Sequence, residues 1–182
     1  MRCWAIAALS LQIVSHAPSL AAQRLLSIGL GGGVSVPQGD LSGDANTGWH
    51  ALGAIVLSTP MQPLGLRADV AYNRFAFNSG TQAVAGGSGY ETVGSATLNA
   101  TYRLPMPGTP MSPYLLAGLG GYRTDCSLEA ACGAATHFGW NAGLGTKLYV
   151  LGFRSFVEAR YHRTSRGGSS VSYFPVTVGL LF

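Results

Sequence analysis

The C-terminal segment of the chain alternates between large apolar residues and other residues. Counting back from Phe182, every second residue is apolar, through Leu180, Val178, Val176 and Phe174. A period of two is typical of a β-strand, and a row of large apolar side chains on one face must meet apolar surroundings. At the edge of a soluble sheet such a strand would be an aggregation hazard. In a closed barrel within lipid, it pairs on both sides and its outer face contacts acyl chains.

The composition favours the same kind of structure. Hydrophobic residues make up 47% of the 182 residues and charged residues only 10%, against roughly 25% charged in typical soluble domains. The 26 glycines could suggest disorder, but aromatic residues, at 10%, recur in strand-like runs. After the N-terminal segment, no stretch reaches the ~20 apolar residues that a membrane helix needs. We therefore expect any membrane span to consist of strands.

The N-terminus predicts export. Met1-Arg2 carries a positive charge, residues 4–14 are mostly apolar, and small residues precede a cleavage point after Ala21 or Ala22. This pattern predicts a signal peptide over residues 1–22 and a single barrel domain over residues 23–182. The alternative, a membrane anchor, would be too short to span. Removal of Arg2 leaves 10 basic and 7 acidic residues, a net charge of +3 instead of +4, which gives no case for nucleic-acid binding.

Gly, Pro, Asn and Ser residues divide the remaining chain into strand-like segments. The predicted strands cover residues 25–36, 47–58, 64–77, 90–104, 113–124, 136–149, 153–164 and 171–182. Segments of this length suit tilted membrane strands. Connections after even-numbered segments are short or proline-stiffened, and the others are generally longer and polar, as in outer-membrane barrels. The predicted fold class is all-β, an eight-stranded antiparallel up-and-down transmembrane β-barrel with both termini in the periplasm.

Alternation within the segments assigns the two faces. Leu98, Val157, Val178 and Leu180 are predicted to face lipid. The opposite face carries six charged residues, namely Arg67, Asp69, Arg103, Lys147, Glu158 and Arg160. The interior of an eight-stranded barrel is just wide enough for side chains, and charges buried there must pair. We expect an interior network of salt bridges, with a narrow ion pathway gated by these residues as the alternative.

Aromatic residues are predicted to form two interfacial belts. One belt, toward the longer loops, comprises Trp49, Tyr72, Phe75, Phe77, Tyr90, Phe138 and Trp140. The other, toward the short turns, comprises Tyr102, Tyr114, Tyr149, Phe153 and Phe182.

Two cysteines, Cys126 and Cys132, remain after the signal peptide. An even count in an exported chain favours a disulfide closing a short loop. The alternative is a metal site, but this pair lacks the four ligands that zinc needs, even with His137 nearby.

Motifs of catalysis are absent from the sequence. It contains no Gly-x-Ser-x-Gly elbow and no His-Glu-x-x-His helix. His50, His137 and His162 are interpreted as structural or rim groups. We therefore expect no catalytic, cofactor-binding or metal-ligating residues, and no cofactor.

With eight strands, a signal peptide and this C-terminal segment, residues 25–182 resemble the OmpA-like/opacity-protein family of small outer-membrane β-barrels. The resemblance implies that Phe174, Val176, Val178, Leu180 and Phe182 form the assembly signal read by the barrel-assembly machinery. It also implies a Gram-negative outer-membrane location in contact with outer-membrane lipid, and a monomer. Family members serve as envelope structural proteins, adhesins or host-interaction surfaces, so an extracellular ligand bound through the loops is expected.

Overall fold

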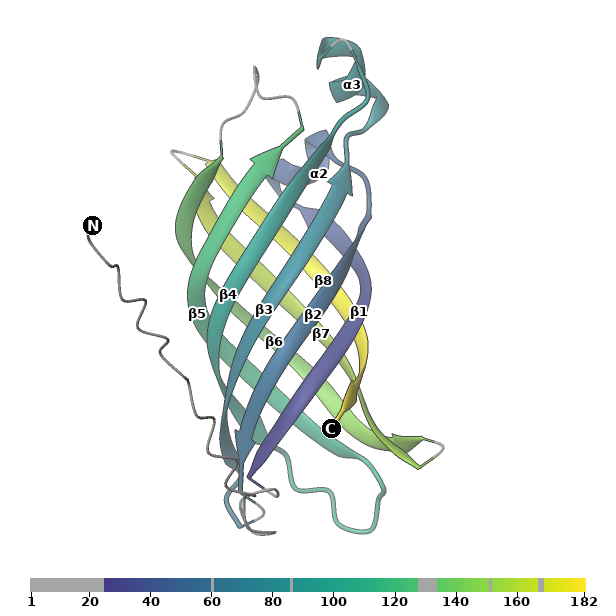
Figure 1. Ribbon diagram of the computed structural model, residues 1–182, viewed down its shortest axis with the longest axis vertical. Helices are drawn as coiled ribbons and strands as arrows, with labels where there is room; N and C mark the ends of the chain where they lie inside the picture. The colour runs from purple at the N-terminus through teal and green to yellow at the C-terminus, as the bar shows by residue number, and fades with distance from the viewer. Residues whose placement is uncertain (1–24, 60, 86, 128–133, 151, 167–168) are drawn as a thin grey trace, which may run out of the picture.

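Eight antiparallel strands close into a barrel in the computed structural model, which describes residues 25–59, 61–85, 87–127, 134–150, 152–166 and 169–182 (Figure 1). The strands are β1 (Leu26–Gln38), β2 (Gly48–Ser58), β3 (Leu64–Ala76), β4 (Tyr90–Arg103), β5 (Ser112–Cys126), β6 (Ala135–Val150), β7 (Phe153–Arg166) and β8 (Ser169–Leu181). Each strand pairs with its neighbours in sequence, and β1 closes the barrel against β8. The predicted fold class is confirmed.

The predicted strand ends differ from the observed ones by at most two residues. The strands β5 and β7 both run two residues beyond their predicted ends, to Cys126 and Arg166. There Cys126 still pairs with Glu91, and Arg166 pairs with Ser169. Backbone pairing continues past the apolar alternation because ladder hydrogen bonds do not require apolar side chains.

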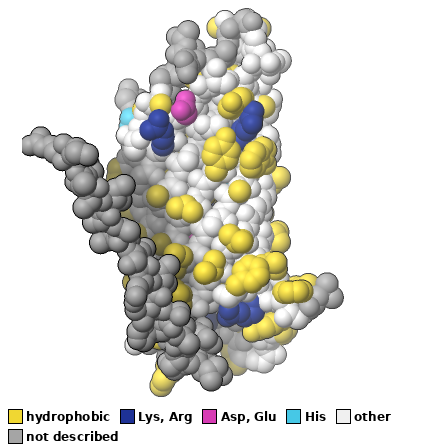
Figure 2. Space-filling view, in the orientation of Figure 1, with side chains coloured by type: hydrophobic (Ala, Val, Ile, Leu, Met, Phe, Trp, Pro, Cys, Tyr) yellow, Lys and Arg dark blue, Asp and Glu magenta, His cyan; other side chains and the backbone are white. Residues whose placement is uncertain are grey.

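The outer wall is apolar at the predicted positions. Leu98 and Val178 are 62% and 60% exposed on the isolated chain, and Val157 and Leu180 also face outward. On the face drawn in Figure 2, hydrophobic side chains are spread over the middle of the wall and Lys or Arg side chains lie near its two ends. A barrel that meets lipid along its middle requires this distribution.

Three aromatic residues predicted to join the interfacial belts lie inside the barrel instead. Phe75, Phe77 and Tyr114 are at most 5% exposed, so this part of the prediction is wrong. Large inward side chains are needed there to fill the cross-section of the lumen. Trp49 and Tyr72, by contrast, stay on the outer wall with their ring centroids 5.7 Å apart.

The two ends of the barrel differ. We call the end with connections 59–63, 104–111 and 151–152 the turn end, and the opposite end, with connections 39–47, 77–89, 127–134 and 167–168, the loop end. Two short helices lie at the loop end, α2 (Asp40–Asp44) and α3 (Ser79–Ala85). From the sequence both segments are expected to be loops, because a helix this short shows no readable period. None of the described helices is long and apolar enough to cross a membrane.

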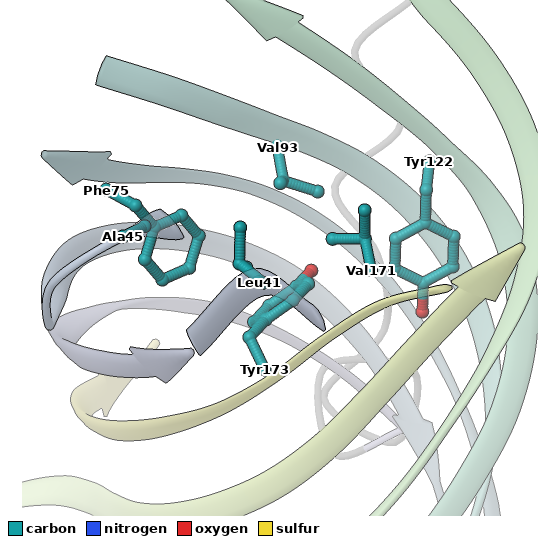
Figure 3. Packing of buried hydrophobic residues seen from close by; sticks show 7 residues of the cluster. All are labelled: Leu41, Ala45, Phe75, Val93, Tyr122, Val171 and Tyr173. Carbon is teal, nitrogen blue, oxygen red and sulfur yellow. The ribbon is translucent and has the colours of Figure 1, made fainter. Parts of the chain in front are cut away.

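The helix α2 closes the loop end of the lumen. Leu41 on α2 and Ala45 directly after it are both buried. Figure 3 shows these two residues among inward side chains of the strands, namely Phe75, Val93, Tyr122, Val171 and Tyr173. This apolar layer, the loop-end cap, separates the deeper lumen from the loops.

Candidate functional site

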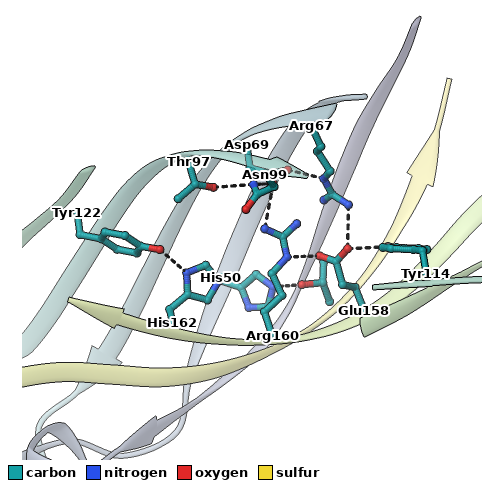
Figure 4. Close-up of polar contacts among 11 residues, drawn as sticks. His50, Arg67, Asp69, Thr97, Asn99, Tyr114, Tyr122, Glu158, Arg160 and His162 are labelled. Atoms are coloured by element: carbon teal, nitrogen blue, oxygen red, sulfur yellow. Dashed lines mark hydrogen bonds and ion pairs between the residues drawn. The ribbon is translucent and has the colours of Figure 1, made fainter. Parts of the chain in front are cut away.

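Four of the six predicted interior charges form one buried network. Arg67 and Asp69 lie two residues apart on β3, and Glu158 and Arg160 lie two residues apart on β7. Because successive residues of a strand point to opposite faces, each pair projects into the lumen together. The four side chains are 0–4% exposed. We call them the charge quartet (Figure 4).

Each arginine of the charge quartet contacts both carboxylates. Arg67 lies 2.6 Å from Asp69 through Nε and 2.8 Å from Glu158 through Nη1. Arg160 lies 2.9 Å from Asp69 through Nη1 and also pairs with Glu158 through Nε. The ring of ion pairs crosses the lumen from β3 to β7. Buried charges in such a ring compensate one another, whereas removal of one would leave the others unpaired.

Two neutral side chains complete the network. Asn99 Nδ2 donates to Asp69 Oδ2 at 2.7 Å, and Tyr114 Oη donates to Glu158 Oε2 at 2.6 Å. Neither Asn99 nor Tyr114 is among the network residues predicted from the sequence. Alternation along β4 places Asn99 on the same inward face as Arg103, and this pattern could have assigned it to the network. Alternation along β5 likewise places Tyr114 inward, although it is assigned to an aromatic belt in the sequence-based prediction.

The other two predicted charges, Arg103 and Lys147, lie outside the ring, toward the turn end. Arg103 Nη2 donates to the backbone oxygen of Gln62 at 3.2 Å. Lys147 Nζ lies 5.8 Å from the ring centroid of Tyr114. Both line the turn-end opening of the lumen. The expectation of a single network of six charges is therefore replaced by a ring of four and a separate cationic group.

A neutral polar layer lies between the charge quartet and the loop-end cap. Ser35 Oγ is 3.0 Å from His50 Nδ1 and donates to Asn73 Oδ1 at 2.8 Å. His50 Nε2 is 2.8 Å from the hydroxyl of Thr177. A serine beside a histidine resembles a nucleophile and its base. Ser35 is 0% exposed and His50 is 4% exposed, so the pair is enclosed and acts as a link between β1, β2, β3 and β8.

His162 belongs to an adjoining aromatic stack. Its ring is parallel to that of Tyr173, with the centroids 4.9 Å apart and an interplanar angle of 7°. The Tyr122 hydroxyl lies 3.0 Å from His162 Nδ1. Both His50 and His162 therefore hold structural positions inside the barrel, as interpreted from the sequence.

The remaining predictions concern residues at the margins of the described chain. Cys126 ends β5 and is buried, but Cys132 lies outside the described residues, as does the proposed signal peptide. The disulfide thus stays a prediction. In the part of the chain that the structure describes, no group of three or more His, Cys, Asp or Glu residues is placed to hold a metal ion.

Comparison with known proteins gives a family match and several similar folds. The family model described as outer membrane protein beta-barrel domain matches residues 6–182. No curated protein matches the sequence. Neisserial surface protein A (NspA) has a TM-score of 0.62 at 16% identity, covering 86% of this chain and 95% of that chain.

Two further solved structures resemble the barrel. Ail, the attachment invasion locus protein of Yersinia pestis, has a TM-score of 0.53 at 16% identity, covering 86% of this chain and 97% of that chain. A major outer membrane protein from Thermus thermophilus has a TM-score of 0.54 at 11% identity, covering 86% of this chain and 98% of that chain. At these identities the likeness concerns the fold.

Proposed function

This chain belongs to the outer membrane protein beta-barrel family, and from that premise we propose that it is a non-catalytic barrel of the Gram-negative outer membrane with a structural and surface-interaction role. In this proposal the turn end faces the periplasm and the loop end faces outward, as the alternation of connection lengths favours. The C-terminal residues from Phe174 to Phe182 serve as its assembly signal.

The charge quartet is the observation that carries the non-conducting part of the proposal. Its ion pairs bridge β3 and β7 across the lumen, and the loop-end cap covers the lumen beyond it. An ion crossing at this level would have to break pairs that are nine-tenths or more buried, at a cost of several kcal/mol. A sealed lumen favours a scaffold over a channel.

The loop end supplies a pre-organised surface for contacts. Asn78 donates from its backbone to the oxygen of Asp44 at 2.9 Å and from Nδ2 to the oxygen of Gly43 at 2.5 Å. Asn78 Oδ1 also accepts from the backbone of Thr81 at 2.9 Å. These bonds tie the connection that holds α2 to the one that holds α3. A rigid loop surface on a stable barrel is where binding is expected.

The names of two proteins with the same fold agree with this role. Ail is described as an attachment invasion protein and NspA as a surface protein, and one Ail structure holds a heparin analogue, sucrose octasulfate. We carry over only the general idea of attachment through outward loops. The partner of this chain would have to be recognised by its own residues at the loop end.

Planar bilayer recording tests the proposal against its alternatives. We expect the purified full chain to give little or no conductance. Steady channels that change in a Glu158→Gln variant would establish the ion-pathway alternative instead. Hydrolysis of envelope lipid that is lost in Ser35→Ala or His50→Ala would establish the less favoured alternative of a barrel enzyme.

An adhesion assay tests the surface role. Cells displaying the chain should adhere to epithelial monolayers more than cells lacking it. Asn78→Ala should reduce this adhesion because it removes the side-chain hydrogen bonds of Asn78 to Gly43 and Thr81. Gln62→Ala at the turn end is the matched control, since it removes a side-chain amide from the opposite end. Equal adhesion of all these strains at equal surface expression would contradict the surface-interaction role.

A further inference from the structure

The lumen is not filled at the turn end. A pocket opens there, on the turn-end side of the charge quartet, with about 40 Å³ of space for the centres of water-sized molecules within about 550 Å³ of empty space that includes open solvent at its mouth. Val56, Phe156 and Leu181 form part of its apolar lining. Its polar lining includes hydroxyl groups of Ser58, Thr101 and Ser112, which can donate hydrogen bonds. We call this space the turn-end pocket.

Three cationic side chains from three strands line the turn-end pocket, namely Arg67, Arg103 and Lys147. Arg67 is 4% exposed, and its Nη2 atom has no hydrogen-bond partner in the described part of the chain. Lys147 contacts the ring face of Tyr114 but forms no ion pair within the described residues. A buried donor without a partner is costly, so each such atom needs an explanation.

A fourth cation lies at the rim. Arg154 lines the adjoining rim space together with Arg103 and Lys147, and its Nη2 donates to Ser27 Oγ at 3.2 Å. The positive charge of the pocket therefore continues to its mouth.

The acidic residues of the chain are distributed in the opposite way. Of the seven acidic residues in the sequence, Asp69 and Glu158 are engaged in the charge quartet. Asp40, Asp44, Glu91 and Asp125 lie in or beside the loop-end connections, and Glu129 lies outside the described residues. The lining of the turn-end pocket therefore contains three cationic side chains and no carboxylate among the residues that form it. Such a cleft attracts an anion strongly.

We propose that the turn-end pocket binds an oxyanion of the phosphate class, held by Lys147 Nζ and the guanidinium groups of Arg67 and Arg103, with neighbouring hydroxyls as further donors. A phosphate group has several acceptor oxygens and carries close to two negative charges at neutral pH. It can therefore accept from donors on β3, β4 and β6 at once, which a single carboxylate oxygen cannot. The bound group would join these three strands at the turn end.

Titration of the full chain with inorganic phosphate tests the proposal. The protein is held in octyl glucoside with Tris chloride at constant ionic strength, so that neither detergent nor buffer supplies a phosphate or sulfonate. We expect saturable amide chemical-shift changes around Lys147, Thr101 and Ser112. Lys147→Gln should weaken binding at least about tenfold, because it removes a charge-assisted hydrogen bond.

Two variants distinguish specific phosphate binding in the pocket from non-specific attraction of phosphate to a positively charged protein. Lys147→Arg keeps the positive charge and should retain binding within a few-fold. Arg163→Gln removes one positive charge from an exposed position on the outward face of β7, and should leave the affinity unchanged. If Arg163→Gln and Lys147→Gln weakened phosphate binding equally, the proposal would be overturned. It would also be overturned if the parent chain showed no saturable binding, either here or in the lipid experiment below.

The phosphate could come from solution or from a lipid headgroup, and a second arm distinguishes these sources. The chain is placed in nanodiscs of phosphatidylglycerol or of a phosphate-free glycolipid. Saturation by free phosphate in detergent identifies a soluble ligand. Shifts that depend on Lys147 and occur only in phosphatidylglycerol nanodiscs identify a headgroup. If neither arm gives shifts that depend on Lys147, the pocket is not a phosphate site.

Discussion

Arg67 and Glu158 are 91 positions apart in the sequence, yet Arg67 Nη1 donates to Glu158 Oε2 at 2.8 Å in the middle of the barrel. The contact joins β3 to β7, which are not neighbours in the sheet. It therefore adds a link across the lumen that the ladder of backbone hydrogen bonds cannot supply. The same carboxylate also accepts from Arg160 and Tyr114, so Glu158 accepts from three side chains, as Asp69 does from Arg67, Asn99 and Arg160.

Glu158→Gln should therefore destabilise the barrel strongly. The variant keeps the shape of the side chain but leaves Arg67 and Arg160 with one carboxylate between them. Breaking a buried ion pair by removing one partner costs about 3–5 kcal/mol. Urea unfolding in lipid vesicles, followed by tryptophan fluorescence, would measure the loss.

Asp44→Asn is the matched control for this measurement, since it removes one negative charge from an exposed position at the loop end. Its free energy of unfolding should stay within about 0.5 kcal/mol of the parent. A Glu158→Gln chain as stable as the Asp44→Asn chain would show that the charge quartet contributes little to stability.

The two-residue period of the strands was enough to predict much of this site. Alternation alone places Arg67, Asp69, Glu158 and Arg160 on the inner face, because the side-chain period of a strand is fixed by its geometry. It also places Arg103 and Lys147 on that face, but it does not give their position along the barrel axis, which we call their height in the lumen. Height depends on the stagger between strands, and that stagger is a property of the closed barrel.

Other features had no local signal that could be read from one sequence. The helix α2 is only five residues long, and its position is set by burial of Leu41 in the barrel mouth. The contact of Ser35 with Asn73 joins residues 38 positions apart. Such contacts follow from tertiary packing, which overrides local preference.

Outward positions should respond to charge according to their depth in the membrane. Leu98 lies near the middle of β4, so Leu98→Arg should lower the free energy of unfolding by about 2–4 kcal/mol. Phe138 lies near the loop end of β6, and Phe138→Arg should cost about 0–1 kcal/mol at an interfacial depth. Unfolding free energies in vesicles would compare the two variants. A larger cost for Phe138→Arg would mean that the apolar band lies closer to the loop end than proposed.

Close packing inside the barrel makes Gly179 sensitive to any side chain. A Cβ atom added there would lie 2.5 Å from Phe156 Cζ and 2.5 Å from the backbone oxygen of Leu30. We expect Gly179→Ala to destabilise the barrel by about 1–3 kcal/mol, as overpacking does. Gly121→Ala is the control, because a Cβ atom at Gly121 meets nothing within 4 Å. Equal unfolding midpoints would indicate that β8 shifts to make room.

The predicted disulfide between Cys126 and Cys132 concerns the loop end and should be dispensable for assembly. A disulfide that closes a loop this short stabilises the folded chain by about 2 kcal/mol in the chain-entropy model. The barrel, however, closes through its own ladder of backbone hydrogen bonds. We expect a chain with both Cys126→Ser and Cys132→Ser to insert normally but to adhere less, since the loop is freer. Heat-modifiable gel mobility would report insertion, and the epithelial assay would report adhesion. Two free thiols in the mature parent protein, found by non-reducing mass analysis, would rule the disulfide out. A failure of the double variant to insert would show instead that the cysteines are needed for folding.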